Sequence, residues 1–250
     1  MSKKLMSLVA AGLLMSAVTY ASDAWKDKDF QNWDQKDVQK ILTDSPWSKK
    51  FQYASGGGAP TISRPLQSLG GAAGPGGGGA TTGGAGSPAN PAGRGASGPE
   101  EPDQQINLTV SWYSSRTIRE AMARQRELAG TPPDEARKKL AEPATGYEVA
   151  VSGPDLAAFG KFQDDDLQAH SYLMARTTKE KMSPSNVIIL RGQNDQPTAI
   201  IFEFAKTTAS GGPTIAQNDK GVVFSTQAGS IPIKVQFDLS KMTDKQGADY

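Results

Sequence analysis

The chain contains no cysteine and a single histidine among its 250 residues. The absence of cysteine excludes a disulfide framework, thiolate catalysis, iron–sulfur clusters and cysteine-ligated zinc. One histidine excludes histidine-rich metal sites and leaves His170 as the sole imidazole for a catalytic dyad. No Gly-x-Ser-x-Gly elbow accompanies it, so we interpret His170 as an ordinary residue at the start of a strand. The sequence therefore predicts neither a metal nor another cofactor.

Neither sign of charge is in excess, because 27 Lys and Arg residues stand against 26 Asp and Glu, a net charge of +1. Dense contact with nucleic-acid phosphates needs a surplus of Lys and Arg, so this balance excludes a strongly basic nucleic-acid-binding protein. The one acidic run, Asp164–Asp166, lacks the spaced ligands, the Gly and the terminal Glu of a calcium loop. We interpret it as a solvated turn.

The first 21 residues follow the pattern of an export signal. A positive start with Lys3 and Lys4 precedes an uncharged apolar run from Leu5 to Val18, and small residues at Thr19 and Ala21 mark a cleavage site. The run is shorter than the roughly 20 residues that span a bilayer comfortably, and no other long apolar run follows. We predict a signal peptide over 1–21, a periplasmic or secreted mature protein and no stable transmembrane segment after its removal.

The remainder divides by composition into three parts: an aromatic N-terminal arm (22–54), a Gly- and Pro-rich segment (55–102) and a domain (103–250). Most of the 27 glycines lie in the second part. Such a segment has too little apolar surface to offset the entropy lost on ordering, so we predict a disordered linker. It is not a phosphate-binding loop, because no Gly-Lys-Ser/Thr sequence follows.

The arm contains three of the four tryptophans and one predicted helix. Apolar residues spaced three and four apart indicate a helix between Asn32 and Ser45, capped by Asn32 or Asp34 and ended by Ser45-Pro46. A helix of about 12 residues is marginal alone, so it must pack on its own domain or on a separate partner. The residues expected to dock are Trp25, Phe30, Trp33, Val38, Ile41, Leu42 and Trp47.

Residues 103–250 have the length of one domain. Alternation predicts a strand over 106–113, and helical spacing predicts a helix over about 116–129, capped by Ser115 and ended by Gly130. A second helix is expected over about 131–141, and a helical turn over 155–159. The connections among the later strands are too short for crossovers and favour antiparallel pairing; the expected strands are 146–152, 170–176, 186–191, 198–205, 221–226 and 231–239.

The last of these strands has the clearest pattern. Ile231, Ile233, Val235 and Phe237 face one way and polar residues face the other, while Pro232 indicates an edge strand. The predicted class is α+β, with a mainly antiparallel sheet of about six or seven strands and two helices on one face.

Two sets of charged residues are candidates for chemistry. Glu148, Glu203 and Asp238 lie on predicted strands and could act as paired carboxylates in hydrolysis, but Glu203 falls on the wet face of the sheet, where a solvated position suffices to explain it. Arg116, Arg119 and Arg137 could form an anion-binding cluster for a partner such as a cell-wall polymer. Charged helix faces are more often solvated faces with local ion pairs.

Three segments carry a resemblance: 33–47, with the pattern W…DVxxIL..SPW, then 110–121 and 235–242. They resemble a set of uncharacterised exported proteins of Gram-negative soil bacteria. The resemblance implies export and the layout of arm and domain, and it implies no catalytic residue.

The sequence favours an exported, non-enzymatic binding protein of the bacterial envelope whose partner is a protein or an envelope component. The alternative is a secreted hydrolase that uses Glu148, Glu203 and Asp238. A purely structural envelope protein is a third, weaker interpretation.

Overall fold

The computed structural model describes residues 23–54, 61–62, 105–159, 162–228 and 231–250. The predicted signal peptide and nearly all of the predicted linker lie outside these residues. Two residues of the predicted linker, Thr61 and Ile62, form the short strand β2.

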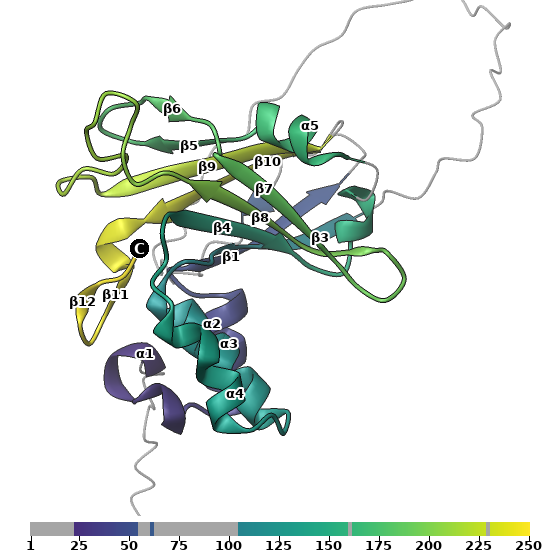
Figure 1. The fold of residues 1–250 in the computed structure, drawn as a ribbon, viewed down its shortest axis with the longest axis vertical. Coiled ribbons are helices and arrows are strands. Elements are labelled where there is room, and N and C mark those ends of the chain that lie inside the picture. Colours follow the sequence, from purple (N-terminus) through teal and green to yellow (C-terminus); the bar gives the residue numbers. More distant parts are fainter. Residues whose placement is uncertain (1–22, 55–60, 63–104, 160–161, 229–230) are drawn as a thin grey trace, which may run out of the picture.

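Two antiparallel sheets form the body of the molecule (Figure 1). The first has six strands in the order β2 (Thr61–Ile62), β1 (Ser48–Ala54), β3 (Gln105–Trp112), β4 (Tyr147–Ser152), β8 (Pro197–Phe204) and β7 (Asn186–Arg191). The second has four strands in the order β10 (Ile231–Asp238), β9 (Gly221–Ala228), β5 (Tyr172–Ala175) and β6 (Lys181–Met182). Near the C-terminus, β11 (Thr243–Asp244) and β12 (Gly247–Ala248) form a small hairpin.

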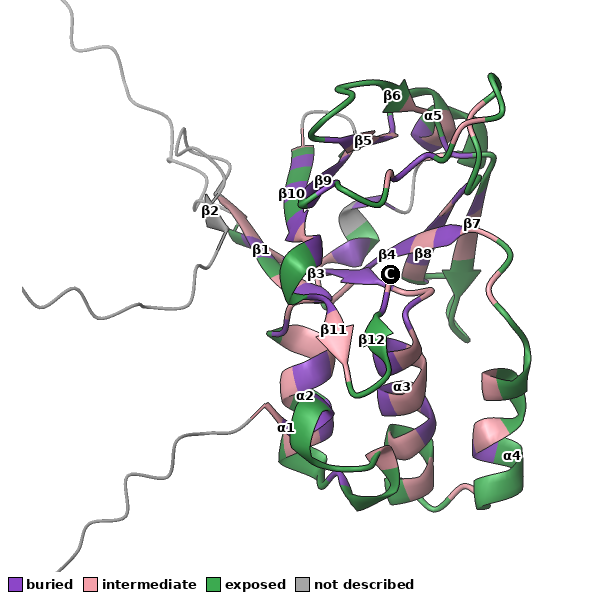
Figure 2. Cartoon of the chain, turned by 90° about the vertical axis from the view of Figure 1, so that its left-hand side faces the viewer, coloured by how far each residue is buried: buried purple, intermediate pink, exposed green. Residues whose placement is uncertain are grey.

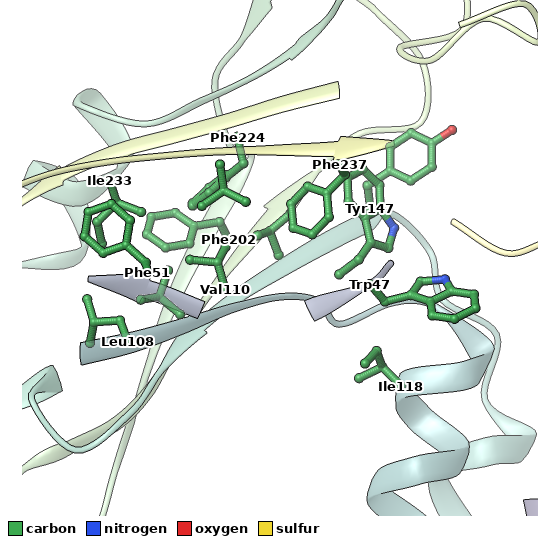
Figure 3. Close-up of a cluster of buried hydrophobic side chains, with 14 of the residues drawn as sticks. Trp47, Phe51, Leu108, Val110, Ile118, Tyr147, Phe202, Phe224, Ile233 and Phe237 are labelled. Carbon is green, nitrogen blue, oxygen red and sulfur yellow. The ribbon is translucent and has the colours of Figure 1, made fainter. Parts of the chain in front are cut away.

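The predicted α+β class with antiparallel pairing is confirmed, but the expectation of one sheet covered by two helices is wrong. The inner faces of the two sheets cover each other, as Figure 3 shows. Phe202 of β8 meets Phe224 of β9 with ring centroids 5.1 Å apart, and Trp112 of β3 meets Phe237 of β10 at 5.3 Å. Because the second sheet already buries the apolar face of the first, the helices are left to pack elsewhere.

Most of the helices lie beyond one end of the sheets, as Figures 1 and 2 both show. This group contains α1 (Ala24–Asp27), α2 (Gln35–Thr43), α3 (Arg116–Leu128) and α4 (Pro133–Arg137), with 3₁₀ turns η1 (Phe30–Asn32) and η2 (Lys138–Ala141). Two further turns, η3 (Leu156–Phe159) and η4 (Leu239–Lys241), follow β4 and β10. The predicted caps are confirmed: Asp34 accepts from the Asp37 amide at 2.8 Å, and Ser115 accepts from the Ile118 amide at 3.2 Å.

The acidic run does not form the predicted turn but opens the helix α5 (Asp164–Ala169). Carboxylates in the first turn are favourable because the helix N-terminus carries partial positive charge. His170 follows this helix and is exposed, and its Nδ1 lies 2.7 Å from the Asp166 carbonyl oxygen. The strand expected to start at His170 begins at Tyr172 instead.

The C-terminal part of the arm is a strand that sequence periodicity did not predict. β1 pairs with β3 along its whole length, from Ser48 opposite Ser111 to Ala54 opposite Gln105. Phe51 of β1 is fully buried between the sheets (Figure 3). The arm is therefore part of the first sheet. In the second sheet, β10 alternates as predicted, with Ile233, Val235 and Phe237 buried, and it is an edge strand.

Candidate functional site

The residues predicted for docking share one hydrophobic core with the sheets. Five are buried and two are half-buried against them: Trp25, Trp33, Val38, Ile41 and Trp47, then Phe30 and Leu42. The rings of Trp25 and Trp47 meet edge to face with centroids 5.6 Å apart. Of the two alternatives left open by the sequence, the structure has the arm packed on its own domain. A separate partner would reach these rings only by displacing that packing.

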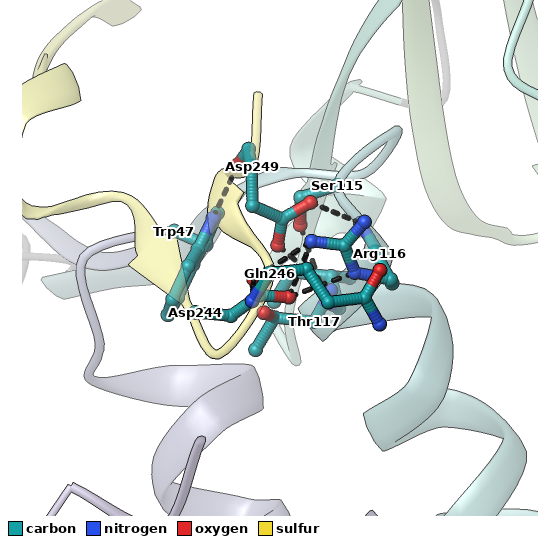
Figure 4. A network of polar contacts seen from close by, with 8 residues as sticks. Trp47, Ser115, Arg116, Thr117, Asp244, Gln246 and Asp249 are labelled. Carbon is teal, nitrogen blue, oxygen red and sulfur yellow. Dashed lines mark hydrogen bonds and ion pairs between the residues drawn. The ribbon is translucent and has the colours of Figure 1, made fainter. Parts of the chain in front are cut away.

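A polar network joins the arm to the start of α3 and to the C-terminus (Figure 4). The buried Trp47 Nε1 donates to the carbonyl oxygen of Asp249 at 2.6 Å. The carboxylate of Asp249 accepts from the backbone amides of Arg116 at 2.7 Å and Thr117 at 2.9 Å. Free amides at a helix N-terminus need acceptors and favour negative charge, so Asp249 stabilises the start of α3 from a distant point in the chain.

A pocket of about 290 Å³ lies where these three segments meet, and we call it the arm pocket. The arm contributes the rings of Trp25, Phe30 and Trp33 to its lining, and α3 contributes Thr117 and Glu120. The hairpin β11–β12 closes it with Asp244, Lys245 and Gln246. Thr117 and Glu120 share a face of α3 because they are three residues apart.

Most charges around the arm pocket are paired. Arg116 binds Asp244 through two hydrogen bonds, Nε to Oδ2 and Nη2 to Oδ1, each 2.7 Å long. Lys245 Nζ lies 2.9 Å from Asp29 Oδ1. Lys28 Nζ lies 2.6 Å from Asp37 Oδ2. Each of these three cations is therefore already paired with a carboxylate.

Glu120 is the exception, because within the described part of the chain its carboxyl group has no hydrogen bond or ion-pair partner. Burial raises the pKa of this carboxyl group from its ordinary value of 4.5 to about 7. The guanidinium of Arg116 lowers the pKa, whereas the negative charges of Asp244, Asp249 and Asp29 raise it. A half-buried carboxyl group without a partner in a pocket is a frequent feature of functional sites.

Two buried polar atoms of the pocket residues also lack a partner among the described residues: Trp25 Nε1 and Thr117 Oγ1. Trp25 and Thr117 are 4% and 1% exposed, so bulk water does not satisfy them. A buried polar group without a hydrogen bond costs about 1–3 kcal/mol. The third such atom, Trp112 Nε1, belongs to a ring that packs between the sheets.

The predicted anion-binding arginines do not form a free cationic cluster. Arg116 is held by Asp244, and Arg119 donates to the carbonyl oxygens of Lys139 and Glu142. Arg137 Nε donates to Glu127 Oε1 at 2.5 Å. Each guanidinium therefore already has an acceptor, so an anion would have to compete with it.

The predicted carboxylates are brought together only in part. Glu148 of β4 stands directly opposite Glu203 of β8. Burial, and then the charge of Glu203, raises the pKa of Glu148. Glu203 Oε2 accepts from Asn186 Nδ2 at 3.1 Å. Asp238 lies at the end of β10 in the other sheet, where its Oδ1 accepts from Ser240 Oγ at 2.5 Å.

Sequence reasoning did not single out Thr117, Glu120 or the C-terminal Asp244 and Asp249 as site residues. The spacing of Arg116, Thr117 and Glu120 on one helix face was the only local signal, and it is common to many solvated helices. The hairpin that completes the pocket is more than a hundred residues away in the chain, and no pattern in the sequence places it there.

Among the residues that the structure describes, no group of three or more acidic or histidine side chains is placed to hold a metal ion. No helix in those same ranges is both long and apolar enough to cross a membrane. The chain matches no protein-family model, no curated protein and no solved structure. Function is therefore inferred from the geometry of the chain itself.

Proposed function

We propose that this protein is an exported, non-enzymatic binding protein of the bacterial envelope and that the arm pocket holds its ligand. The observation that carries the proposal is that three residues lining one pocket, Glu120, Trp25 and Thr117, each have a polar side-chain group without a partner among the described residues. The export signal pattern of residues 1–21 supports the location outside the cytoplasm.

The other acids around the pocket favour binding over catalysis. Hydrolysis by two carboxylates needs a second carboxylate that is free to act as nucleophile or base. Asp244 accepts from Nε and Nη2 of Arg116, Asp249 accepts from two backbone amides, and Asp29 is paired with Lys245. Among the described acids around the pocket, Glu120 is thus the one whose carboxyl group is free, while its neighbours already have partners. A single free carboxyl group suits the binding of a ligand better than the catalysis of a reaction on it.

The proposal is tested with the chain lacking residues 1–21, by following the indole signals of Trp25 and Trp33 in nitrogen-edited NMR spectra. A panel of neutral sugars, amines, amino acids and short peptides is titrated in turn. We expect one class to shift the Trp25 signal, and we expect Thr117→Val to weaken that binding. A panel in which no class moves either indole signal would refute a ligand-binding role for the pocket.

The cross-strand pair of Glu148 and Glu203 supports a second candidate, a secreted hydrolase. Directly opposed carboxyl groups with one raised pKa can divide the roles of acid and base. A screen on glycoside and peptide substrates, with Glu203→Gln as the control, decides it. If product forms with the native chain and not with Glu203→Gln, the hydrolase hypothesis is favoured. If no substrate gives product, the hydrolase hypothesis is refuted.

A further inference from the structure

The charges of the arm pocket favour a cationic ligand. The nearby cations, Arg116, Lys28 and Lys245, are each paired with an aspartate, so an anionic ligand would have to break one of these pairs. Among the residues that the structure describes, the Glu120 carboxyl group has no such partner. A ligand ammonium group placed against it would form a charge-assisted hydrogen bond in a partly desolvated position, where such bonds are strongest.

The hydrogen-bonding groups of the pocket require more than an ammonium group. The indole Nε1 of Trp25 is only a donor, so its partner on the ligand must be an acceptor such as a hydroxyl oxygen. The hydroxyl of Thr117 can donate and accept. Both atoms have less than 1 Å² of exposed surface in the structure, so a ligand reaches them only when neighbouring side chains of the pocket move.

The size and lining of the pocket limit the ligand further. A volume of about 290 Å³ is enough for a ligand of the size of one monosaccharide. The half-buried ring of Phe30 provides apolar surface beside the carboxyl group. Aromatic rings attract both ammonium groups and the apolar faces of ring-shaped ligands.

We propose that the ligand of the arm pocket is a small hydroxylated primary amine, an amino sugar or an amino alcohol. Its ammonium group binds Glu120, and its hydroxyl oxygens satisfy Trp25 Nε1 and Thr117 Oγ1. This inference rests on the proposed binding function and specifies the chemistry that the pocket recognises. An amino sugar and an amino alcohol share this chemistry, and the probes below separate them.

The test uses the nitrogen-15-labelled chain without residues 1–21 and four probes: glucosamine, glucose, N-acetylglucosamine and ethanolamine. The shift of the Trp25 indole signal is followed, and Trp25→Phe identifies that signal while keeping an aromatic ring. We expect glucosamine to bind at least about tenfold more tightly than glucose or N-acetylglucosamine, because only glucosamine carries the ammonium group. Ethanolamine binding as well would indicate that an amino alcohol suffices, and its failure would indicate the sugar ring.

Glu120→Gln keeps the shape of the side chain and removes its charge, so we expect it to weaken glucosamine binding about tenfold. Glu180→Gln, at an exposed position outside the pocket, is the matched control and should leave binding unchanged. Circular dichroism verifies that each variant is folded. Equal binding of glucose and glucosamine, or glucosamine binding that survives Glu120→Gln, would overturn the amine inference while leaving a binding function in place. If none of the four probes binds, the inference also falls, and the broader panel decides the binding function separately.

Discussion

Replacing Glu120 by Gln should stabilise the protein at neutral and alkaline pH although it removes a charged residue from a helix. The carboxyl group lies in the arm pocket beside Asp29, Asp244 and Asp249, and its favourable charge partner Arg116 is already bound to Asp244. Ionisation of Glu120 is therefore less favourable in the folded protein than in the unfolded chain, and its pKa rises from 4.5 to about 7. Glutamine has a similar shape and cannot ionise.

The direction of the pH dependence follows from proton linkage. Between pH 4.5 and about 7 the folded protein keeps a proton on Glu120 that the unfolded chain has released, so the free energy of unfolding falls as the pH rises through this range. For a fully buried group, this pKa difference would correspond to about 3.5 kcal/mol, at about 1.4 kcal/mol per pKa unit. Glu120 is only half-buried, and screening by water reduces the expected effect to about 1–2 kcal/mol.

The assay is thermal and urea unfolding of the native chain and Glu120→Gln at pH 4.5, 6 and 8, followed by tryptophan fluorescence. We expect equal stability at the lowest pH and a gain of about 2–8 °C in the midpoint for the variant at pH 8, at about 2–4 °C per kcal/mol. Glu180→Gln should show no such pH-dependent gain. A variant that is destabilised at pH 8, or a difference that is the same at every pH, would refute the reasoning.

Three further substitutions are measured by urea unfolding, two at the contacts that join the arm, α3 and the C-terminus and one at the close approach of the chain after β4 to β3. Trp47→Phe should lower the free energy of unfolding by about 2–3 kcal/mol, since it leaves the Asp249 carbonyl without its donor and creates a cavity. Asp249→Asn should cost about 1 kcal/mol through the loss of negative charge at the start of α3. Gly153→Ala should cost about 1–3 kcal/mol, because φ is +136° and a Cβ would lie 2.9 Å from the Asn107 carbonyl oxygen. A loss below about 0.5 kcal/mol in any of the three would contradict the role assigned to that contact.

Features set by neighbouring residues could be predicted from the sequence. The helix α3 with its Ser115 cap, the cap of α2 at Asp34 and the alternation of β10 all follow from spacings within a few residues. The partition of the strands into two sheets could not be predicted in this way. An apolar strand face indicates that something covers it, but its periodicity does not say whether a helix or a second sheet does so.

The candidate site was harder to predict than the fold for the same reason. The aromatic residues of the arm were visible as a group, and they line one side of the arm pocket. Glu120 is one of several acids on a charged helix, and its position in the fold gives it an unusual pKa, first through burial and then through the charges of Asp244 and Asp249. That position depends on the contact of Trp47 and of the α3 amides with the C-terminus, which no local pattern encodes.

The pairing of β1 with β3 changes the interpretation of what the Gly-rich segment connects. Ala54 and Gln105 are opposed partners in the first sheet, so the roughly fifty residues between them connect two neighbouring antiparallel strands rather than a separate module to a domain. The entropic cost of connecting two strands grows only with the logarithm of the length of the connection, so a connection of that length costs about 2 kcal/mol more than one ten times shorter. The burial of Phe51 alone, at about 1.5–3 kcal/mol, is of the same size. A long insertion at this point is therefore compatible with a stable sheet. The arm residues that line the arm pocket remain attached to the rest of the fold through β1.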